Sequence, residues 1–334
     1  MKIKLKWIAL AIALPVALVA AFFGWASSGS FPRDRYAETL TFGENPSVPE
    51  TPDTFTVVSY NIGYLSGLTN NVAVARERAL FERNQATAIA ALSELEADFI
   101  GFQEIDFDAW RSFQMNQLRA IAAELGLNYG ATAINWDKNY VPFPYWPPTA
   151  HFGKVLSGQA VLSRFPVTAN ERIVLEKVPD NPFFYNALYL DRVAQVSQIA
   201  IGDQTLVMIN VHLEAFDNAT RQRQTAAVRE LAESYAADYP VLLIGDFNSA
   251  LNRAAEGDRS INILLESAQL QVATSPALLE APEQATFPSD QPEFKLDYLF
   301  YTPDTIELVN TNVISAAAQA SDHLPLAMTF RLIP

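Results

Sequence analysis

Short apolar runs separated by polar segments recur along most of the chain. Residues 241–244 read Val-Leu-Leu-Ile, and comparable runs lie within residues 56–61, 98–104 and 206–213. Apolar runs of this length, bounded by polar residues, predict strands that are buried on both faces. The sequence therefore predicts several buried β-strands.

Other patterns indicate how these strands are connected and covered. Gly202-Asp203 separates two strand-like runs and is a signal for a tight hairpin, which requires antiparallel strands, so we expect a mixed sheet. Residues 76–96 and 112–125 carry apolar side chains at helical spacing. We expect both segments to form helices that cover a sheet.

The amino terminus carries an uncharged apolar stretch, residues 7–26, which follows Lys2, Lys4 and Lys6. Roughly 20 apolar residues suffice for a helix to cross a bilayer, so this stretch predicts a transmembrane helix. The lysines would stay on the cytoplasmic side, which places everything after Ser27 on the opposite side.

A cleaved signal peptide is the alternative interpretation, because Gly24-Trp25-Ala26 offers small residues at a plausible cleavage site. The length of the apolar stretch favours an uncleaved anchor. We expect a membrane-anchored protein whose folded domain is extracytoplasmic, in a periplasm or at a cell surface. If the segment is cleaved, the domain would be secreted.

Composition divides the chain further and narrows its chemistry. Residues 27–53 are rich in Ser, Pro and Glu and predict a linker, between an anchor or signal segment at 1–26 and a folded domain at 54–334. Half of the 334 residues are hydrophobic, enough for a substantial core. The chain contains no Cys, which excludes disulfides, thiolate zinc sites and cysteine nucleophiles.

The folded domain is strongly acidic. Residues 1–53 hold five basic and five acidic residues, so 18 of the 23 Lys and Arg and 32 of the 37 Asp and Glu lie beyond them, and the net charge there is still −14. Avid binding of duplex DNA requires a broad basic surface. The charge therefore argues against tight duplex binding.

Polar side chains follow the apolar runs where the predicted strands end. Asn61 and Glu104 each close one run, and Asp246 and Asn248 follow the run Val-Leu-Leu-Ile. His212, one of three histidines, ends another run. Polar groups at strand ends are well placed to line a cleft. Carboxylates, amides and imidazoles together are the components of a metal-dependent phosphoester hydrolase.

Seven segments occur in a characteristic order: Tyr60-Asn61, Gln103-Glu104, residues 158–166, residues 210–213, Gly245-Asp246-Phe247-Asn248, residues 296–298 and Ser321-Asp322-His323. This ordered set resembles the endonuclease/exonuclease/phosphatase superfamily, which includes deoxyribonuclease I-like nucleases, abasic-site endonucleases, neutral sphingomyelinases and inositol polyphosphate 5-phosphatases. The resemblance extends from about Phe55 to Leu332. It implies an α+β fold, a four-layer α/β sandwich with two packed mixed β-sheets and outer helices, here preceded by an N-terminal transmembrane helix.

Phosphoester hydrolysis requires relief of charge on the nonbridging oxygens, a nucleophilic water and a stabilised leaving oxygen. Magnesium suits the first task because it takes oxygen ligands and often uses only one or two protein carboxylates. We expect Glu104 as the main metal ligand, Asn61 as an amide ligand, and Asp322 as a ligand of this site or a second one. Mg²⁺ is the expected cofactor, with Mn²⁺ as the alternative.

His323 is the expected general base, because imidazole titrates near neutral pH. The resemblance implies that Asp297 is the carboxylate that fixes the tautomer of this histidine. Asp246 and Asn248 are expected to orient the attacking water and hold the phosphate. His212 is expected to hydrogen-bond a phosphoryl oxygen or to assist the leaving group.

Residues 135–148 are rich in aromatic residues and Pro and lack strand or helix periodicity, which predicts a loop near the cleft. Aromatic rings with polar edges suit a membrane interface. Packing on the domain and stacking on single-stranded nucleic acid are the alternative uses of the same rings.

Together these features predict a membrane-tethered, extracytoplasmic, metal-dependent phosphodiesterase that hydrolyses phospholipid headgroups or other small phosphodiesters. An exported Mg²⁺-dependent nuclease is the alternative. A catalytically silent binding module is less favoured, because no expected catalytic position is replaced. The membrane is the expected partner through the N-terminal helix and residues 135–148. No obligate protein partner is expected, and nucleic acid would enter only as a substrate.

Overall fold

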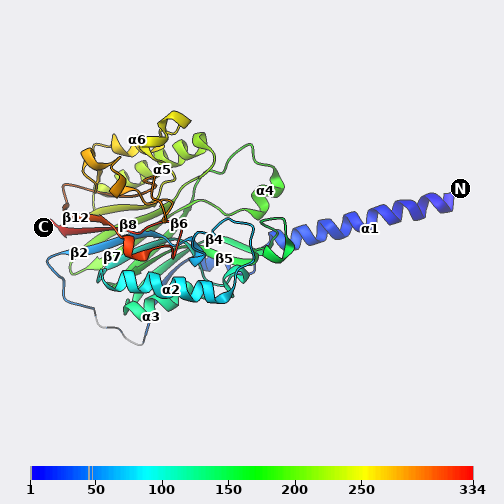
Figure 1. Cartoon of the computed structure of the whole chain (residues 1–334), viewed down its shortest axis with the longest axis horizontal. Helices are drawn as coiled ribbons and strands as arrows, with labels where there is room; N and C mark the ends of the chain where they lie inside the picture. The colour runs from blue at the N-terminus through cyan, green and yellow to red at the C-terminus, as the bar shows by residue number, and fades with distance from the viewer. Residues whose placement is uncertain (1, 44–45, 47, 334) are drawn as a thin grey trace.

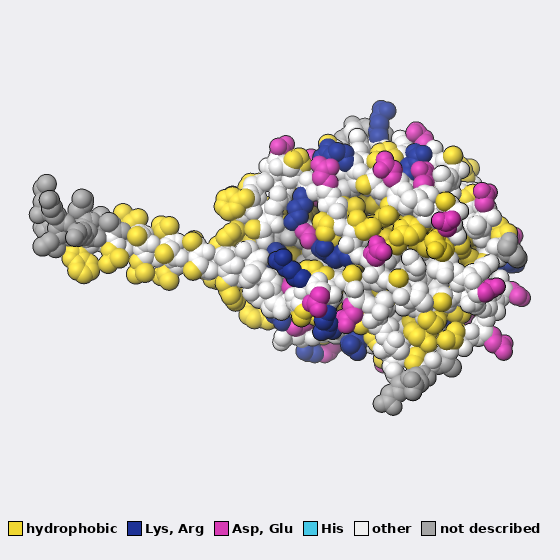
Figure 2. Space-filling model, turned by 180° about the vertical axis from the view of Figure 1, so that it is seen from behind, with side chains coloured by type: hydrophobic (Ala, Val, Ile, Leu, Met, Phe, Trp, Pro, Cys, Tyr) yellow, Lys and Arg dark blue, Asp and Glu magenta, His cyan; other side chains and the backbone are white. Residues whose placement is uncertain are grey.

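The computed structural model describes residues 2–43, 46 and 48–333, and only the backbone of residues 2–6, 8–9 and 254–256. Figure 1 shows a β-rich domain flanked by helices, from which α1 (Lys2–Ser27) projects as one long helix. The apolar side chains of α1 are exposed along most of its length (Figure 2). The side chains of the N-terminal lysines, on which the predicted orientation rests, lie outside the described part.

The other helices are α2 (Arg78–Ser93), α3 (Gln117–Leu125), α4 (Phe183–Leu188), α5 (Asn218–Ala236) and α6 (Ser260–Leu265). The strands are β1 (Ala37–Thr41), β2 (Phe55–Asn61), β3 (Phe99–Asp106), β4 (Tyr129–Val141), β5 (Gly153–Ser163), β6 (Val167–Val174), β7 (Val193–Ile201), β8 (Gln204–His212), β9 (Val241–Asp246), β10 (Gln271–Val272), β11 (Asp297–Tyr301), β12 (Ile306–Val313) and β13 (Leu326–Leu332). The expected helices at 76–96 and 112–125 are confirmed by α2 and α3.

The strands form two sheets. The first sheet has the order β1-β4-β5-β3-β2-β13-β12, and the second has the order β10-β11-β9-β8-β7-β6. The pairs β2 with β3 and β8 with β9 are parallel, whereas the other described pairs are antiparallel. The predicted mixed sheets are therefore confirmed. The hairpin at Gly202-Asp203 is also confirmed, since it joins β7 to β8 with Ile201 opposite Gln204.

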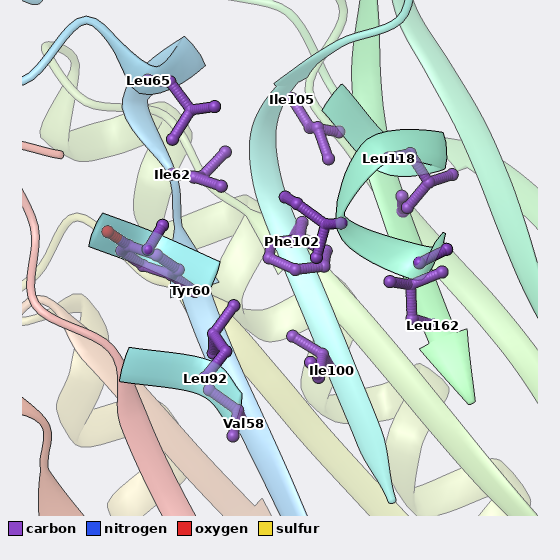
Figure 3. Close-up of a cluster of buried hydrophobic side chains, with 14 of the residues drawn as sticks. Val58, Tyr60, Ile62, Leu65, Leu92, Ile100, Phe102, Ile105, Leu118 and Leu162 are labelled. Atoms are coloured by element: carbon purple, nitrogen blue, oxygen red, sulfur yellow. The ribbon is translucent and has the colours of Figure 1, made fainter. Parts of the chain in front are cut away.

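Three apolar layers hold the domain together, as expected for a four-layer sandwich. In β2, Phe55 and Val57 point into the layer between the sheets, while Val58 and Tyr60 point toward the helices. This alternation follows from the two-residue period of a strand. Figure 3 shows the layer on the helix side, where these residues of β2 meet residues of β3 and Leu92 of α2. On the other side of the sandwich, a corresponding apolar layer lies between the second sheet and helices α5 and α6.

Two expectations about irregular segments were wrong in part. Residues 27–53, expected as a linker, contain β1, which pairs with β4 along its whole length. Residues 135–148, expected as a loop, begin inside β4, where Trp136 is only 5% exposed and its indole N–H donates to the carbonyl of Leu188. In both segments, pairing with a distant strand sets the local structure, and the local pattern does not reveal that pairing.

A pair of buried amides joins the two sheets. Gln103 Nε2 on β3 donates to Asn210 Oδ1 on β8 over 2.6 Å, and Asn210 Nδ2 donates to the carbonyl of Phe102 over 2.9 Å. Both amide side chains are fully buried. Leaving a buried polar group without a partner costs about 1–3 kcal/mol, so this contact fixes how the sheets face each other.

We predict that Asn210→Leu destabilises the protein by about 2 kcal/mol, because it leaves Gln103 Nε2 without its strongest partner. This loss should lower the Tm by roughly 4–8 °C in thermal unfolding of the full-length protein in detergent. Asn310→Leu, the same substitution at an exposed position of β12, is the matched control. Equal Tm values for the two variants would contradict the structural role of Asn210.

Candidate active site

The carboxyl ends of four strands meet at one edge of the sandwich. Because β2 is parallel to β3 and β8 is parallel to β9, each pair delivers its terminal side chains to the same edge. Asn61 and Glu104 come from the first sheet, and His212 and Asp246 come from the second, where they are register partners. Asp297, at the start of the antiparallel β11, pairs with Asp246.

Two backbone features aim these side chains. The register of β3 against β5 shifts between Phe102 and Ile105, and Glu104 within this bulge has a φ of 51°. A bulge of this kind re-aims a side chain. Gly245 lies where β9 approaches β8 so closely that a Cβ would lie 1.9 Å from the carbonyl oxygen of Val211. Only glycine fits there, which explains its place directly before Asp246.

Glu104 and Asp322 share one amide donor. Asn70 Nδ2 lies 2.9 Å from Glu104 Oε2 and 3.2 Å from Asp322 Oδ2. Burial, followed by the charge of Asp322, raises the pKa of Glu104 to about 7. Two adjacent carboxylates with so few donors form a set of hard oxygen atoms that suits a divalent cation.

Asp246 lies at the centre of the site. Its Oδ2 accepts from Asn61 Nδ2 over 2.9 Å and lies 3.6 Å from His212 Nε2 and 3.7 Å from His323 Nε2. Its Oδ1 accepts from the backbone N–H of Asn248 over 2.8 Å. Burial raises the pKa of Asp246 to about 6, against the opposing charge of His323. The carboxylate thus connects the groups of both sheets.

His323 is held by a buried carboxylate. Its Nδ1 lies 2.9 Å from Asp297 Oδ2, which also accepts from the hydroxyl of Thr286 over 2.6 Å. Nδ1–H therefore points at Asp297 and Nε2 points at Asp246. Burial disfavours the imidazolium, but the charges of Asp297 and Asp246 outweigh it and raise the pKa of His323 to about 10.

His212 has the opposite charge preference. Burial, followed by the charges of Arg192 and His323, lowers the pKa of its imidazole well below the usual range. Its Nε2 lies 3.9 Å from Glu104 Oε1, so it stands between the carboxylates of the two sheets. The site therefore contains one neutral and one cationic imidazole.

All eight residues expected from the sequence are brought together, and two more take part that sequence reasoning missed. Arg192, which directly precedes β7, is 5% exposed, lies 3.6 Å from Glu214 and leaves Nη1 without a partner among the described residues. A charged residue at the entrance of a buried strand was the available signal. Asn70, in a polar loop after β2, has no comparable signal in the sequence.

Two sets of residues offer ligand atoms for a metal. Asp246, Asp297 and His323 offer ligand atoms within 4.8 Å of one another. In this set, however, Nδ1 of His323 is already engaged by Asp297. Glu104 and Asp322 are not hydrogen-bonded to an imidazole, so their oxygens could also receive a cation.

Comparison with known proteins shows which family the sequence matches and which proteins it is similar to. The model of the endonuclease/exonuclease/phosphatase family matches residues 58–323. A UPF0294 protein of Vibrio cholerae is 28% identical over 147 residues, which are 44% of this chain and 47% of that protein. The chain thus spans about half the length of this curated relative.

Solved structures share the fold at low sequence identity. An endonuclease/exonuclease/phosphatase protein from Beutenbergia cavernae has a TM-score of 0.61 at 19% identity, covering 84% of this chain and 72% of its own. The catalytic domain of human nocturnin with bound sulfate has a TM-score of 0.57 at 16% identity, covering 91% of this chain and 100% of its own.

A mannosyl-6-phosphatase from Bacteroides thetaiotaomicron has a TM-score of 0.55 at 16% identity, covering 84% of this chain and all of its own. Because the family model spans most of the chain and the site residues lie within or beside it, the chain belongs to the endonuclease/exonuclease/phosphatase family, whose members are phosphoester hydrolases and generally depend on divalent metals.

Proposed function

We propose that the chain is a membrane-anchored, extracytoplasmic, Mg²⁺-dependent phosphodiesterase. The observation that carries this proposal is the opposition of two groups across the edge of the sandwich. One group is the carboxylate pair of Glu104 and Asp322, and the other is the Asp297–His323 pair. Between them lie Asp246 and the neutral His212.

The cation would be held by Glu104 and Asp322, with the amide oxygen of Asn61 as a further ligand. A bound Mg²⁺ would neutralise charge on the nonbridging oxygens and oppose the effect of the carboxylates on the pKa of His323. Magnesium fits because the donors are oxygens and few of them come from the protein.

Proton transfer falls to His323. Asp297 holds Nδ1–H, so Nε2 is the atom that would accept a proton from the attacking water, once a bound cation has lowered the pKa of His323 and left Nε2 unprotonated. Asp246 Oδ2 lies 3.7 Å from that nitrogen, which suits two groups that hold one water between them. His212 remains neutral and therefore donates a hydrogen bond to the phosphate or the leaving oxygen, while Arg192 supplies positive charge.

The charge of the site favours diesters. With a divalent cation bound and His323 in the neutral form that a base requires, the four carboxylates of Glu104, Asp246, Asp297 and Asp322 still exceed the positive charges of the cation and Arg192 by one. A phosphodiester carries one negative charge, whereas a monoester carries up to two, and like charges in a low-dielectric site repel strongly. The surplus of carboxylates thus supports a singly charged substrate. A nuclease would use the same chemistry, and the acidic domain argues against avid duplex binding.

The anchor is favoured over a signal peptide by the way α1 meets the domain. Among the described residues, the window Leu10–Ser27 is long and apolar enough to cross a membrane. Ala26, where cleavage is expected in the alternative, is only 2% exposed. Cleavage there would remove Trp25, whose carbonyl accepts from Asn139 Nδ2 over 3.1 Å.

The proposal is tested by turnover of the full-length protein on phospholipids, a soluble phosphodiester, DNA and phosphomonoesters, with Mg²⁺ and with EDTA. Mg²⁺-dependent cleavage of diesters in preference to monoesters is the expected result. Cleavage of DNA alone would establish the nuclease instead.

We predict that His323→Ala lowers kcat by about 10²–10⁴-fold, because the proton acceptor is lost. His151→Ala removes a histidine outside the site, which pairs with the hydroxyl of Tyr140, and should leave kcat unchanged. Both variants are assayed on bis(p-nitrophenyl) phosphate with their Tm values compared. Full activity of His323→Ala would refute its assignment as base.

Chelation by EDTA should abolish turnover and Mg²⁺ should restore it. Glu104→Gln should raise the Mg²⁺ concentration for half-maximal activity at least about tenfold, because a ligand charge is removed. A calorimetric Mg²⁺ titration should show the same weakening without an activity readout. Glu94→Gln, an exposed change at the end of α2, is the control. Unchanged Mg²⁺ affinity in Glu104→Gln would place the cation elsewhere.

Arg192→Met should lower kcat/KM by roughly 10²-fold, since a preorganised cation is lost from the phosphate site. It should also change the pH profile. Arg192 lowers the pKa of His212, so its removal raises that pKa and shifts the acidic limb of kcat/KM to higher pH. Arg223→Met, at an exposed ion pair with Glu176, is the control. An unshifted acidic limb would show that Arg192 does not act through His212.

A further inference from the structure

We propose that the catalytic domain is seated directly on the bilayer that holds α1, and that its substrate is the phosphodiester headgroup of lipids in that bilayer. The contact surface is an aromatic collar of Phe22, Trp25, Tyr145, Trp146, Phe183 and Phe184. The seating rests on the structure alone, whereas the substrate class also rests on the proposed phosphodiesterase activity.

The join between α1 and the domain leaves no slack. The backbone N–H of Asn139 on β4 donates to the carbonyl of Ser28 over 2.8 Å, and Lys138 Nζ donates to the carbonyl of Ser27 over 3.0 Å. Just beyond, the backbone N–H groups of Ser30 and Phe31 donate to the carboxylate of Asp137. Figure 1 shows α1 passing straight into the domain at this point. A helix held in this way cannot act as a loose tether.

The collar surrounds this join. The Phe22 ring lies 5.8 Å from the rings of Trp25 and Tyr140, and the Phe23 ring lies 6.1 Å from that of Phe183 on α4. The loop after β4 is attached to the same place, since Tyr140 pairs with His151, whose Nε2 contacts the carbonyl of Tyr145.

The collar rings remain in contact with solvent. Phe183 is 77% exposed, Trp146 is 76% exposed and Tyr145 is 66% exposed. Most other large apolar side chains of the domain are buried in its core. Trp and Tyr with an apolar body and a polar edge are enriched where hydrocarbon meets headgroups. Because the collar is continuous with an apolar helix long enough to span a bilayer, the bilayer is the occupant that fits.

A short path of contacts leads from the collar to the active site. On the far side of α4 from Phe183, the ring of Tyr185 stacks on that of Tyr189 with centroids 5.0 Å apart. The hydroxyl of Tyr189 accepts from Arg192 Nη2 over 3.3 Å. The charge of Arg192 in turn lowers the pKa of His212. The collar and the phosphate site are therefore linked through α4, Tyr189 and Arg192.

The sheet topology places the active site on the same side of the domain. In Figure 1 the C-terminus, which follows β13, lies at the end opposite α1. Because β2 is antiparallel to β13, β2 ends toward α1, and β3 runs parallel to it. Asn61 and Glu104 thus lie at the membrane-proximal edge.

Charge supports this orientation. Figure 2 shows Lys and Arg gathered on the half of this face near α1, while Asp and Glu dominate the far half. At the join itself, Lys138 binds the carbonyl of Ser27, and Arg33 and Lys177 lie near enough for their charges to act on it. Basic residues next to a span are attracted to anionic lipids, whereas the acidic remainder is repelled. The charge distribution therefore holds the collar against the bilayer.

The absence of Cys allows a direct test of the seating in the full-length protein. Trp146→Cys and Val309→Cys each introduce one labelling site, the second on β12 at the end far from α1. The labelled proteins are reconstituted in phosphatidylcholine vesicles containing a minority of phosphatidylglycerol. We expect brominated lipid to quench a dye at position 146 but not at 309. Equal quenching at the two positions would overturn the seating.

The substrate class is tested with the double variant Trp146→Ser/Phe183→Ser against the control Val309→Ser. The double variant should cleave headgroup-labelled lipid in the vesicle at least about tenfold more slowly, because apolar area no longer enters the bilayer. Its turnover of soluble bis(p-nitrophenyl) phosphate should be unchanged. Undiminished lipid cleavage would overturn the role of the collar in catalysis.

Different results would contradict the proposed function and the further inference. A wild-type protein that is inactive on both lipid and soluble diester contradicts the proposed function, while the quenching result still decides the seating. A wild-type protein that cleaves the soluble diester but not vesicle lipid contradicts the substrate class alone.

Discussion

The contact between Gln103 and Asn210 is the constraint on which the active site depends. Most of the layer between the sheets is apolar, and apolar contacts allow two sheets to slide. A second buried amide supports the pair, since Gln159 Nε2 on β5 donates to the carbonyl of Asn210 over 2.7 Å. The amide pair removes that freedom, since any shift leaves buried polar groups without partners. Glu104 follows Gln103 directly and His212 lies two residues beyond Asn210, so the pair sets the 3.9 Å separation of the two functional side chains.

The two sheets approach each other closely at Gly101 on β3, where a larger side chain would not fit. A Cβ on Gly101 would lie 2.5 Å from Ile244 Cδ1 of the second sheet. Glycine therefore allows β3 to approach β9, whose end carries Asp246. The layer is close-packed where it supports the site, which keeps the separation of the catalytic groups fixed.

The site brings several buried carboxylates together, and their charged forms are unfavourable without a compensating positive charge. Burial raises the pKa of both Glu104 and Asp246, which means that their charged forms are disfavoured in the absence of a cation. Arg192 and the imidazolium of His323 offset only part of this charge. A divalent cation that binds the folded state would therefore also stabilise it. Metal binding would in this way be coupled to folding through the same few side chains.

The sequence by itself determined the elements whose signal is local. Uninterrupted apolar runs identified β2, β3, β8 and β9, and helical spacing identified α2 and α3, because burial on one or both faces fixes these patterns. The order of motifs also identified the eight side chains that the structure brings together. Their proximity follows from topology, since parallel strands end at one edge.

Only the tertiary structure decided the features that depend on distant partners. β1 forms because β4 offers its edge, and Trp136 is buried while Trp146 is exposed, although both lie in the same aromatic segment. Arg192 and Asn70 join the site through contacts with residues far away in the sequence. Local patterns record which residues are buried, but they do not record which distant strand, ring or carboxylate meets them, because that pairing is set by how the two sheets pack.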